Sequence, residues 1–221
     1  MKTLAVIPAR GGSTRLKNKN IYPLKGKPLI KWSVETVVES ECFDDILVST
    51  DSDEIWNAVS DLNVIRHQRN PIHATTKATV LNAMLDLMRT SEKRYDVFAY
   101  FLPTCPFFSI TDVEESLELF KKDQNTDFVV SMVEMQDTIQ LACLMNNNHV
   151  LPIFDNLKCG MTNSKFIEKY YKPSGAFYMG RWERILEEEN FFKGNVKGVV
   201  MDKSKYVDIN DLSDIKYGEQ L

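Results

Sequence analysis

The segment 10–20, which is rich in basic and small residues, carries the strongest chemical signal in the sequence. It follows an apolar run at 3–7 that predicts a buried strand, and it contains the turn Gly11-Gly12-Ser13. Glycines at the carboxyl end of a strand allow backbone N–H groups to approach an anion closely, while Arg and Lys side chains neutralise its charge. The segment therefore predicts a site for the phosphates of a small ligand, although a solvated basic loop is the alternative for any such charge run. Its spacing excludes a Walker A loop and a dinucleotide-binding G-x-G-x-x-G motif.

The distribution of charge agrees with a small anionic ligand rather than a macromolecular polyanion. The first 34 residues contain eight Lys and Arg and no Asp or Glu, although the chain as a whole has a net charge of -4. A local basic segment on an acidic body suits a small, highly charged anion, but it does not suit the coating of DNA or of an anionic membrane. We therefore expect no nucleic-acid partner and no membrane association.

Length and composition indicate a globular chain that forms a single domain over residues 1–221. With 43% hydrophobic and 26% charged residues, it is unlike collagenous, mucin-like or disordered chains. No apolar run is long enough for the h-region of a signal peptide or for a bilayer span, so we expect a cytoplasmic protein. The four cysteines lie far apart and there are only three histidines, which predicts neither a zinc site nor disulfides.

The elements that must position the basic segment follow from two alternating patterns. Short β-branched runs alternate with longer stretches whose apolar residues have helical spacing, as in βα units that build a mainly parallel sheet with helices on both faces. We predict strands at 3–7, 45–50, 64–67, 97–102, 128–133, 175–179 and 197–201, and helices at 28–40, 53–62, 78–90, 112–122, 182–189 and 212–218. The predicted fold class is therefore α/β, with a doubly wound sheet.

The alternation is interrupted between about 135 and 174, which predicts an inserted element. Apolar runs at 141–145 and 150–154 flank a polar turn at 146–149, and this pattern is typical of a β-hairpin. Such an excursion from an α/β frame often packs on a second subunit. We therefore expect a dimerisation element there.

A series of motifs stands in a characteristic order along nearly the whole chain. The motifs are Ile7-Pro8-Ala9-Arg10-Gly11-Gly12-Ser13, Lys19-Asn20, Gly26-Lys27-Pro28-Leu29-Ile30, Val48-Ser49-Thr50-Asp51, Pro103-Thr104-Cys105-Pro106, Gly175-Ala176-Phe177-Tyr178 and Val207-Asp208-Ile209-Asn210. In this order the chain resembles the cytidylyltransferases that activate acidic sugars, above all the acylneuraminate (CMP-sialic acid) synthetases. The same group includes the Kdo and pseudaminic acid cytidylyltransferases. The first motif is specific, whereas the later ones are weak singly.

The resemblance implies a Rossmann-like nucleotidyltransferase fold and an enzyme that joins CTP to a 2-keto-3-deoxy sugar acid, giving the CMP-sugar and pyrophosphate. It also implies Mg²⁺ or Mn²⁺ as cofactor, a homodimer, and a place in nucleotide-sugar biosynthesis for cell-surface polysaccharide. In this reaction the anomeric hydroxyl of the sugar attacks the α-phosphate of CTP. The step requires charge neutralisation and positioning more than covalent help from the protein.

The resemblance further implies roles for individual residues. The implied catalytic residues are Arg10, Lys19 and Asp208. The implied nucleotide-binding residues are Ala9, Arg10, Gly11, Gly12, Ser13, Arg15, Lys19, Asn20, Arg69 and Thr79, of which Arg69 and Thr79 match positions that contact cytosine. The implied metal ligands are Asp208 and Asn210. The implied contacts of the sugar acid are Thr104, Lys165 and Ser174, with Lys169 and Lys172 as further candidates for its carboxylate.

The sequence departs from the family pattern mostly on the side that holds the sugar. Leu102 replaces a glutamine and Ser174 replaces an asparagine, whereas the residues implied to bind the nucleotide are kept. Thr14 in place of a lysine concerns phosphate binding, and Asn210 in place of a second aspartate concerns the metal. For Asp208, capping of the final helix is the alternative role. We predict an enzyme that activates a sialic-acid-like nonulosonic acid with CTP; the alternatives are a Kdo or other sugar-acid cytidylyltransferase and a nucleotide-binding homologue with little turnover.

Overall fold

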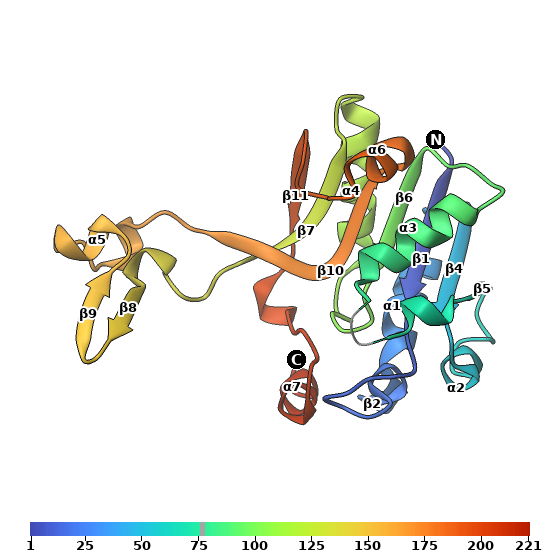
Figure 1. Ribbon diagram of the computed structural model, residues 1–221, viewed down its shortest axis with the longest axis horizontal. Coiled ribbons are helices and arrows are strands. Elements are labelled where there is room, and N and C mark those ends of the chain that lie inside the picture. Colours follow the sequence, from blue (N-terminus) through green and yellow to red (C-terminus); the bar gives the residue numbers. More distant parts are fainter. Residues whose placement is uncertain (76–77) are drawn as a thin grey trace.

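A seven-stranded sheet forms the centre of the structure, a computed structural model that describes residues 1–75 and 78–221 (Figure 1). The strand order is β11-β7-β10-β6-β1-β4-β5, and all neighbours are parallel except the two pairs that involve β10. The strands of this sheet are β1 (Thr3–Pro8), β4 (Asp45–Thr50), β5 (Ile65–Gln68), β6 (Val97–Phe101), β7 (Phe128–Glu134), β10 (Tyr171–Arg181) and β11 (Val196–Val200). Two separate hairpins pair β2 (Pro23–Leu24) with β3 (Lys27–Pro28), and β8 (Cys143–Asn146) with β9 (His149–Pro152). The predicted α/β class with a mainly parallel sheet is confirmed.

Helices cover both faces of the sheet because the strands point alternate side chains to opposite sides. On β1, Ala5 and Ile7 belong to one apolar core, which includes side chains of α1, α2 and α4, whereas Leu4 and Val6 belong to a second core with α3 and α6. The helices are α1 (Leu29–Glu39), α2 (Asp53–Asn57), α3 (Val80–Thr90), α4 (Ile110–Lys122), α5 (Asp155–Lys158), α6 (Trp182–Glu188) and α7 (Leu212–Gly218), with single 3₁₀ turns at η1 (Lys19–Ile21), η2 (Pro71–His73), η3 (Ile139–Leu141), η4 (Ser164–Phe166) and η5 (Lys203–Lys205). In the described part of the chain, no helix is both long enough and apolar enough to cross a membrane.

A third, smaller apolar cluster ties the loop after β1 to the C-terminal end of the chain. Leu16 and Leu24 pack there with Val207 and Ile209, and with Ile215 of α7. Burial of these side chains stabilises the contact through the hydrophobic effect. The cluster therefore holds the basic loop after β1 against the C-terminal segment, although the two lie nearly the whole chain apart in sequence.

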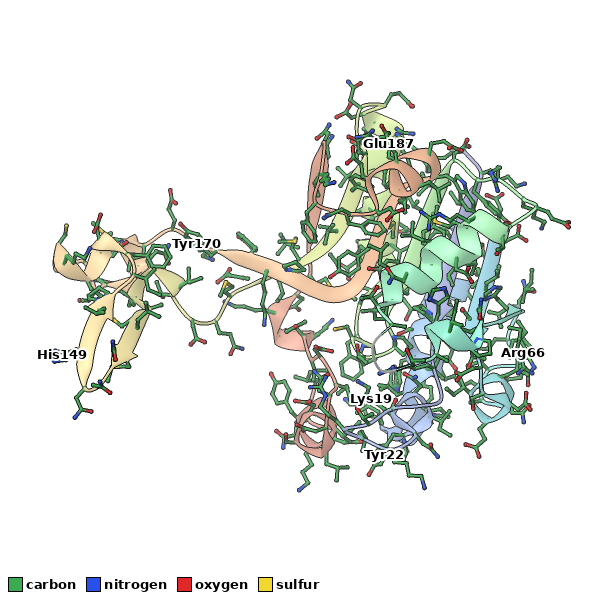
Figure 2. The ribbon with its side chains drawn as sticks, in the orientation of Figure 1. Lys19, Tyr22, Arg66, His149, Tyr170 and Glu187 are labelled. Carbon is green, nitrogen blue, oxygen red and sulfur yellow. The ribbon has the colours of Figure 1, made fainter. Side chains whose placement is uncertain are left out.

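An arm formed by residues 135–170 projects from the sheet between β7 and β10 (Figures 1 and 2). Figure 2 shows His149 at its far end and Tyr170 where the chain returns toward the sheet. Asn147 and Asn148, between β8 and β9, have positive φ values of 44° and 70°, as a type I′ hairpin turn requires. The predicted hairpin is therefore present, while its packing on a second subunit stays a prediction. Large apolar side chains are exposed along the arm at Leu144, Met145, Val150, Leu151, Ile153, Met161 and Phe166.

Candidate functional site

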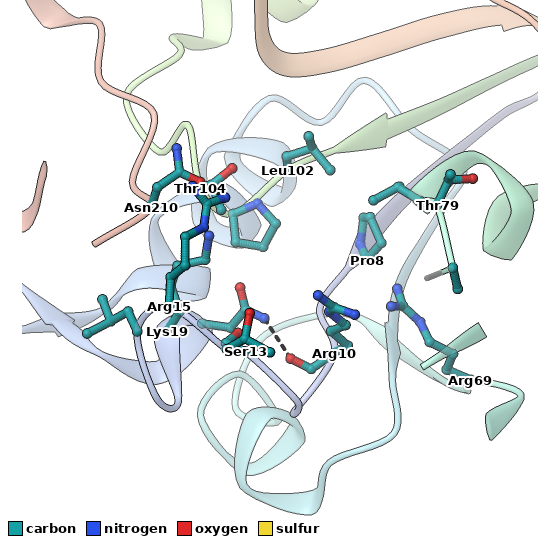
Figure 3. Close-up of a pocket in the computed structure, with 16 residues that line it drawn as sticks. Pro8, Arg10, Ser13, Arg15, Lys19, Arg69, Thr79, Leu102, Thr104 and Asn210 are labelled. Atoms are coloured by element: carbon teal, nitrogen blue, oxygen red, sulfur yellow. Dashed lines mark hydrogen bonds between the residues drawn. The ribbon is translucent and has the colours of Figure 1, made fainter. Parts of the chain in front are cut away.

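A cavity of about 230 Å³ lies at the carboxyl ends of β1 and β6, beside the loop that follows β1 (Figure 3). Four cationic side chains line it, and its lining within the described residues includes no Asp or Glu. Figure 3 shows Arg10 and Arg69 on one side and Arg15 and Lys19 on the other. The lining residues are Pro8, Arg10, Ser13, Thr14, Arg15, Leu16, Lys19, Asn20, Arg69, Ala78, Thr79, Val80, Leu102, Pro103, Thr104 and Asn210. Such a concentration of positive charge in a concave site favours a small polyanion.

Arg10 is held at this cavity by hydrogen bonds at both ends of the residue. Nδ2 of the buried Asn20 donates to the carbonyl oxygen of Arg10 (2.9 Å), as Figure 3 shows. Nη1 of Arg10 donates to the carbonyl oxygen of Thr75 (2.5 Å). Because both contacts are made by the protein itself, the guanidinium is oriented before any ligand arrives.

Close backbone packing explains the glycine at position 11. A Cβ there would lie 3.1 Å from the Cβ of Ser52, which is tighter than ordinary van der Waals contact. The N–H of Gly11 donates to Oδ1 of Asp51 (2.8 Å), so this group braces the loop. Gly11, like Ala9 and Gly12, belongs to the loop but does not line the cavity. From the sequence, the backbone N–H groups of this turn were expected to face phosphate. The N–H of Gly11 instead donates to the carboxylate of Asp51, which the sequence did not indicate.

Arg15 and Lys19 reach the cavity through contacts with the C-terminal segment. Nζ of Lys19 donates to the carbonyl oxygen of Ile209 (2.9 Å), and Nη2 of Arg15 donates to Oδ1 of Asn210 (2.7 Å). The N–H of Ile209 donates to the carbonyl oxygen of Thr104 (2.7 Å), which fixes the segment against the turn after β6. Since side chains alternate along an extended chain, Ile209 is buried and Asn210 lines the cavity.

Lys19 lies among other positive charges that the lining of the cavity does not balance with acidic side chains. Burial lowers the pKa of Lys19, and the nearby positive charges of Arg15 and Arg10 lower it further, while Asp208 raises it. Mutual repulsion of the three cations is relieved when a polyanion binds among them. The electrostatics therefore favour a phosphate ligand at this point.

Arg69, directly after β5, is buried and incompletely paired. Its side chain belongs to a residue that is 4% exposed, and Nη2 has no hydrogen-bond partner in the described part of the chain. Burial lowers the pKa of Arg69 to about 10, although the negative charge of Asp51 opposes this shift. The group therefore stays charged at neutral pH. A buried cationic N–H without a partner is unfavourable, and a ligand acceptor would satisfy it. Thr79 lines the same cavity as the N-cap of α3; its Oγ accepts from the N–H of Asn82 (3.1 Å), which leaves its O–H able to donate.

The three residues expected to contact a sugar acid are not brought together. Thr104 lines the cavity, but Ser174 is 2% exposed, and its hydroxyl forms a hydrogen bond with Oγ of Ser131 (2.7 Å) inside the sheet. Lys165 lies on the arm, in η4, and lines neither this cavity nor the one beside it. Within one described chain, only Thr104 is therefore positioned beside the cationic cavity.

A second cavity, of about 550 Å³, lies between the base of the arm and the C-terminal segment. Asp208 lines it and connects it to the first cavity, because Oδ2 of Asp208 accepts a hydrogen bond from Nδ2 of Asn210 (3.0 Å). Lys172 also lines it, with Nζ 5.4 Å from the ring centroid of Tyr206, and no carboxylate among the described residues lies within ion-pair distance of that amine. Lys169, in contrast, pairs with the last residue of β7 (2.8 Å). Sequence reasoning named Lys172 only as one of three candidates and missed Tyr206, because no local motif connects them.

The oxygen atoms of Asp208 and Asn210 fit a hard divalent cation that also binds phosphate. Mg²⁺ prefers oxygen ligands and needs only one or two protein carboxylates when phosphate and water complete its shell. Oδ1 of Asn210 already accepts from Arg15, so Asp208 is the stronger candidate. No group of three His, Cys, Asp or Glu side chains suited to a metal occurs in the part of the chain that is described.

The final helix is capped by Asp211 and not by Asp208. The Asp211 side chain accepts from the N–H groups of Ser213 and Asp214, in a capping box that starts α7. The hydrogen bond from Ser213 also lowers the pKa of Asp211. The alternative in which Asp208 caps this helix is therefore wrong, and the Asp208 carboxylate remains available beside the cavities.

The chain is similar in sequence and in fold to several known proteins. The family model described as Cytidylyltransferase matches residues 4–172. The pseudaminic acid cytidylyltransferase of Campylobacter jejuni (strain 81-176) is 31% identical over 231 residues, which cover 100% of this chain and 96% of that protein. The N-acylneuraminate cytidylyltransferase of Escherichia coli O18:K1:H7 is 29% identical, over 97% of this chain and 51% of that protein. Among solved structures, a CMP:2-keto-3-deoxy-manno-octonic acid synthetase complexed with CTP has the same fold, with a TM-score of 0.73, 16% identity, and coverage of 100% of this chain and 98% of the other.

Proposed function

Because the chain belongs to the cytidylyltransferase family, we propose that it transfers the cytidylyl group of CTP to a sialic-acid-like nonulosonic acid, giving the CMP-sugar and pyrophosphate. The observation that carries this proposal is the convergence of Arg10, Arg15, Lys19 and Arg69 on one cavity whose described lining has no acidic side chain. The similarity to enzymes named as pseudaminic acid and N-acylneuraminate cytidylyltransferases supports CTP as the nucleotide and a nonulosonic acid as the acceptor.

We assign the triphosphate to Arg10, Arg15 and Lys19. Negative charge increases on the pyrophosphate as its bond to the α-phosphate breaks, and fixed cations stabilise that charge without reorganising. Asn20 contributes by holding the backbone of Arg10, and the Ser13 hydroxyl can add a hydrogen bond to a phosphate oxygen. These residues act by positioning and by charge, not by forming a covalent bond.

We assign the base to Arg69 and Thr79. Both residues line the cavity and carry donors, the N–H groups of the Arg69 guanidinium and the O–H of Thr79. Cytosine presents two acceptors, O2 and N3, whereas N3 of uracil carries a proton that would face these donors. A site that leaves a buried polar group unpaired with the wrong ligand discriminates strongly against it. The pair therefore favours CTP over UTP.

We place the sugar acid in the second cavity, with its carboxylate at Lys172. This amine is the one lysine of the three sequence candidates that lines the cavity, whereas Lys165 lies on the arm and Lys169 is paired. From this cavity an anomeric hydroxyl would approach the nucleotide past Asp208. A sugar-acid site near Thr104 and Lys172 thus replaces the sequence-based set of Thr104, Lys165 and Ser174.

Asp208 would hold Mg²⁺ or Mn²⁺ together with phosphate oxygens of CTP. When bound, such an ion neutralises phosphate charge and orients the triphosphate. The protein prepares for this through a chain of contacts: Arg15 orients Asn210, and Asn210 orients the carboxylate of Asp208. Asn210 therefore acts chiefly as a positioning residue in this proposal.

We also propose that the arm joins two copies of the chain into a homodimer. Its exposed apolar side chains, among them Leu144, Met145 and Val150, follow closely on one another in the hairpin. On a monomer, exposed apolar residues are usually scattered singly. A hairpin on a projecting arm can pack against the same arm of a second copy as an isologous contact. Light scattering should give the mass of a dimer, and Leu144→Glu combined with Val150→Glu should give a monomer; a monomeric wild-type chain would contradict the proposal.

The setting of the enzyme follows from its chemistry. All four cysteines are free thiols, which supports a reducing, cytoplasmic compartment. We place the product in the supply of activated sugars for cell-surface polysaccharide. The single domain over residues 1–221 would then contain both substrate sites, with the arm as its dimerisation element.

The test is pyrophosphate release with each of the four nucleoside triphosphates against neuraminic, legionaminic, pseudaminic and Kdo-type acids. Turnover with CTP and at least one nonulosonic acid is expected. Turnover with UTP or GTP but not CTP would contradict the base assignment. Binding of CTP without release of pyrophosphate from any acid would favour the nucleotide-binding homologue, and turnover with the Kdo-type acid alone would favour that substrate.

A further inference from the structure

Beside Arg69, two polar side chains on neighbouring strands form a hydrogen-bonded pair that has no part in the proposed reaction. Ser49 of β4 and His67 of β5 are partners in the parallel register. Nδ1 of His67 lies 3.1 Å from Oγ of Ser49, and Nε of Arg69 donates to the same Oγ over 3.5 Å. Since side chains two apart on a strand share a face, His67 and Arg69 lie on the same side of the sheet.

The hydrogen bonds around Ser49 favour one state of the imidazole. Nε of Arg69 can only donate, so Oγ of Ser49 accepts from it. When His67 is neutral with its proton on Nε2, Nδ1 accepts the hydroxyl proton of Ser49, and each proton along this chain of contacts has an acceptor. A proton on Nδ1 would place two donors on the Ser49 oxygen and take this acceptor from the hydroxyl proton.

The surroundings of His67 favour this neutral form. Burial and the positive charge of Arg69 lower the pKa of His67, while Asp86 of α3 opposes them. Nε2 of His73, in η2, lies 3.7 Å from the carboxylate of the same Asp86. The neutral, accepting imidazole is thus the form present at neutral pH.

We infer that Ser49 and His67 are positioning residues for Arg69: the neutral imidazole orients the Ser49 hydroxyl, and that hydroxyl holds the guanidinium with Nη2 directed at the base of the nucleotide. The inference rests on the proposed function only in assigning the base of CTP to Arg69. It adds that nucleotide affinity depends on the protonation of a side chain that does not touch the nucleotide. Affinity is full while His67 is neutral and falls as the pH falls through its lowered pKa.

Direct binding of CTP, measured by calorimetry on the full chain with Mg²⁺ between about pH 5 and pH 8, tests this inference without requiring turnover. Ser49→Ala and His67→Leu should each raise the Kd for CTP about fivefold at pH 8, equivalent to the roughly 1 kcal/mol of a typical hydrogen bond. His67→Asn should bind like the wild type there, because its amide oxygen takes the place of Nδ1 as the acceptor. In turnover assays the first two variants should raise the KM for CTP and leave kcat nearly unchanged.

The pH profile separates positioning from a general loss of structure. The γ-phosphate of CTP itself titrates at about pH 6, within this range, so the quantity to compare is the ratio of Kd between the wild type and His67→Asn at each pH. This ratio should rise toward about fivefold at low pH. The matched control His73→Asn should keep the wild-type pH profile. Equal affinities of wild type and Ser49→Ala, or identical pH profiles of wild type and His67→Asn, would overturn the inference; failure of the wild type to bind CTP would instead overturn the proposed function.

Discussion

Replacement of Arg69 by methionine should make the free protein more stable and a poorer binder of CTP. The guanidinium is almost fully buried, and its Nη2 lacks a hydrogen-bond partner within the described residues. An unsatisfied buried donor costs about 1–3 kcal/mol, and the long contact with Ser49 returns only part of that. Arg69→Met keeps most of the side-chain volume and removes the charge, so we expect a gain of about 1 kcal/mol, or about 2–4 °C in Tm for a chain of this length.

The same substitution should weaken the stabilisation that CTP provides. At about 100 times its Kd, a ligand stabilises the folded protein by about 2.7 kcal/mol. A tenfold loss of affinity, the minimum expected when a hydrogen bond from a charged donor is lost, reduces this to about 1.4 kcal/mol at the same CTP concentration. Thermal unfolding followed with and without CTP measures both quantities in one experiment.

A matched control lies on β5, three residues before Arg69. Arg66 points to the other side of β5 and pairs with Asp53 (2.6 Å), so Arg66→Met should keep the full CTP-dependent rise in Tm. A variant Arg69→Met that is less stable than the wild type and retains the CTP effect would show that Arg69 is a structural residue. That result would refute the assignment of the base to this side chain.

Three further predictions concern the other assigned groups. Arg10→Ala should lower kcat/KM for CTP at least about tenfold, equivalent to about 1.4 kcal/mol of transition-state stabilisation, in steady-state assays of pyrophosphate release; an unchanged value would exclude a role at the triphosphate. Lys172→Met should raise the KM for the sugar acid at least about tenfold without changing the KM for CTP, whereas the paired Lys169→Met should leave both unchanged; equal effects of the two would argue against a carboxylate site at Lys172. Asp208→Asn should raise the Mg²⁺ concentration needed for half-maximal turnover at least about tenfold, and a metal titration that matches the wild type would place the ion elsewhere.

Those parts of the fold that depend on local pattern could be predicted from the sequence. The strand Asp45–Thr50 and the helix Leu212–Gly218 have the predicted bounds, because each combines a clear apolar pattern with flanking turn or cap residues. The helix predicted at 53–62 ends at Asn57 instead. The apolar Val59 and Leu62 that suggested a longer helix are placed by tight turns, in which their N–H groups bond three residues back.

Features that depend on distant contacts were not predictable from a local pattern. The strand predicted at 175–179 extends over Tyr171–Arg181, because β10 is paired on both sides and a bulge between Pro173 and Tyr178 accommodates residues that usually interrupt strands. Gly175 has a φ of 82° within this bulge, a value that favours glycine.

The same distinction applies to the candidate site. The cationic side chains that follow β1 were recognisable because they lie in one short segment after a strand. The contact of Arg15 with Asn210 depends on an apolar cluster that joins the two ends of the chain, and the place of Lys172 beside Tyr206 depends on the course of the arm. Neither leaves a local signal. For that reason the residues assigned to the nucleotide could be predicted in detail from the sequence. The residues predicted to contact the sugar acid, in contrast, lie apart in the fold.

Detection of the product measures the proposed cytidylyl transfer itself. The purified chain would be incubated with CTP, Mg²⁺ and a nonulosonic acid, and both the nucleotide sugar and pyrophosphate would be measured by mass spectrometry and an enzymatic assay. The proposed transfer predicts CMP-sugar and pyrophosphate in equal amounts, with no product from UTP. Formation of CDP and phosphate, or of CMP without a CMP-sugar, would contradict it.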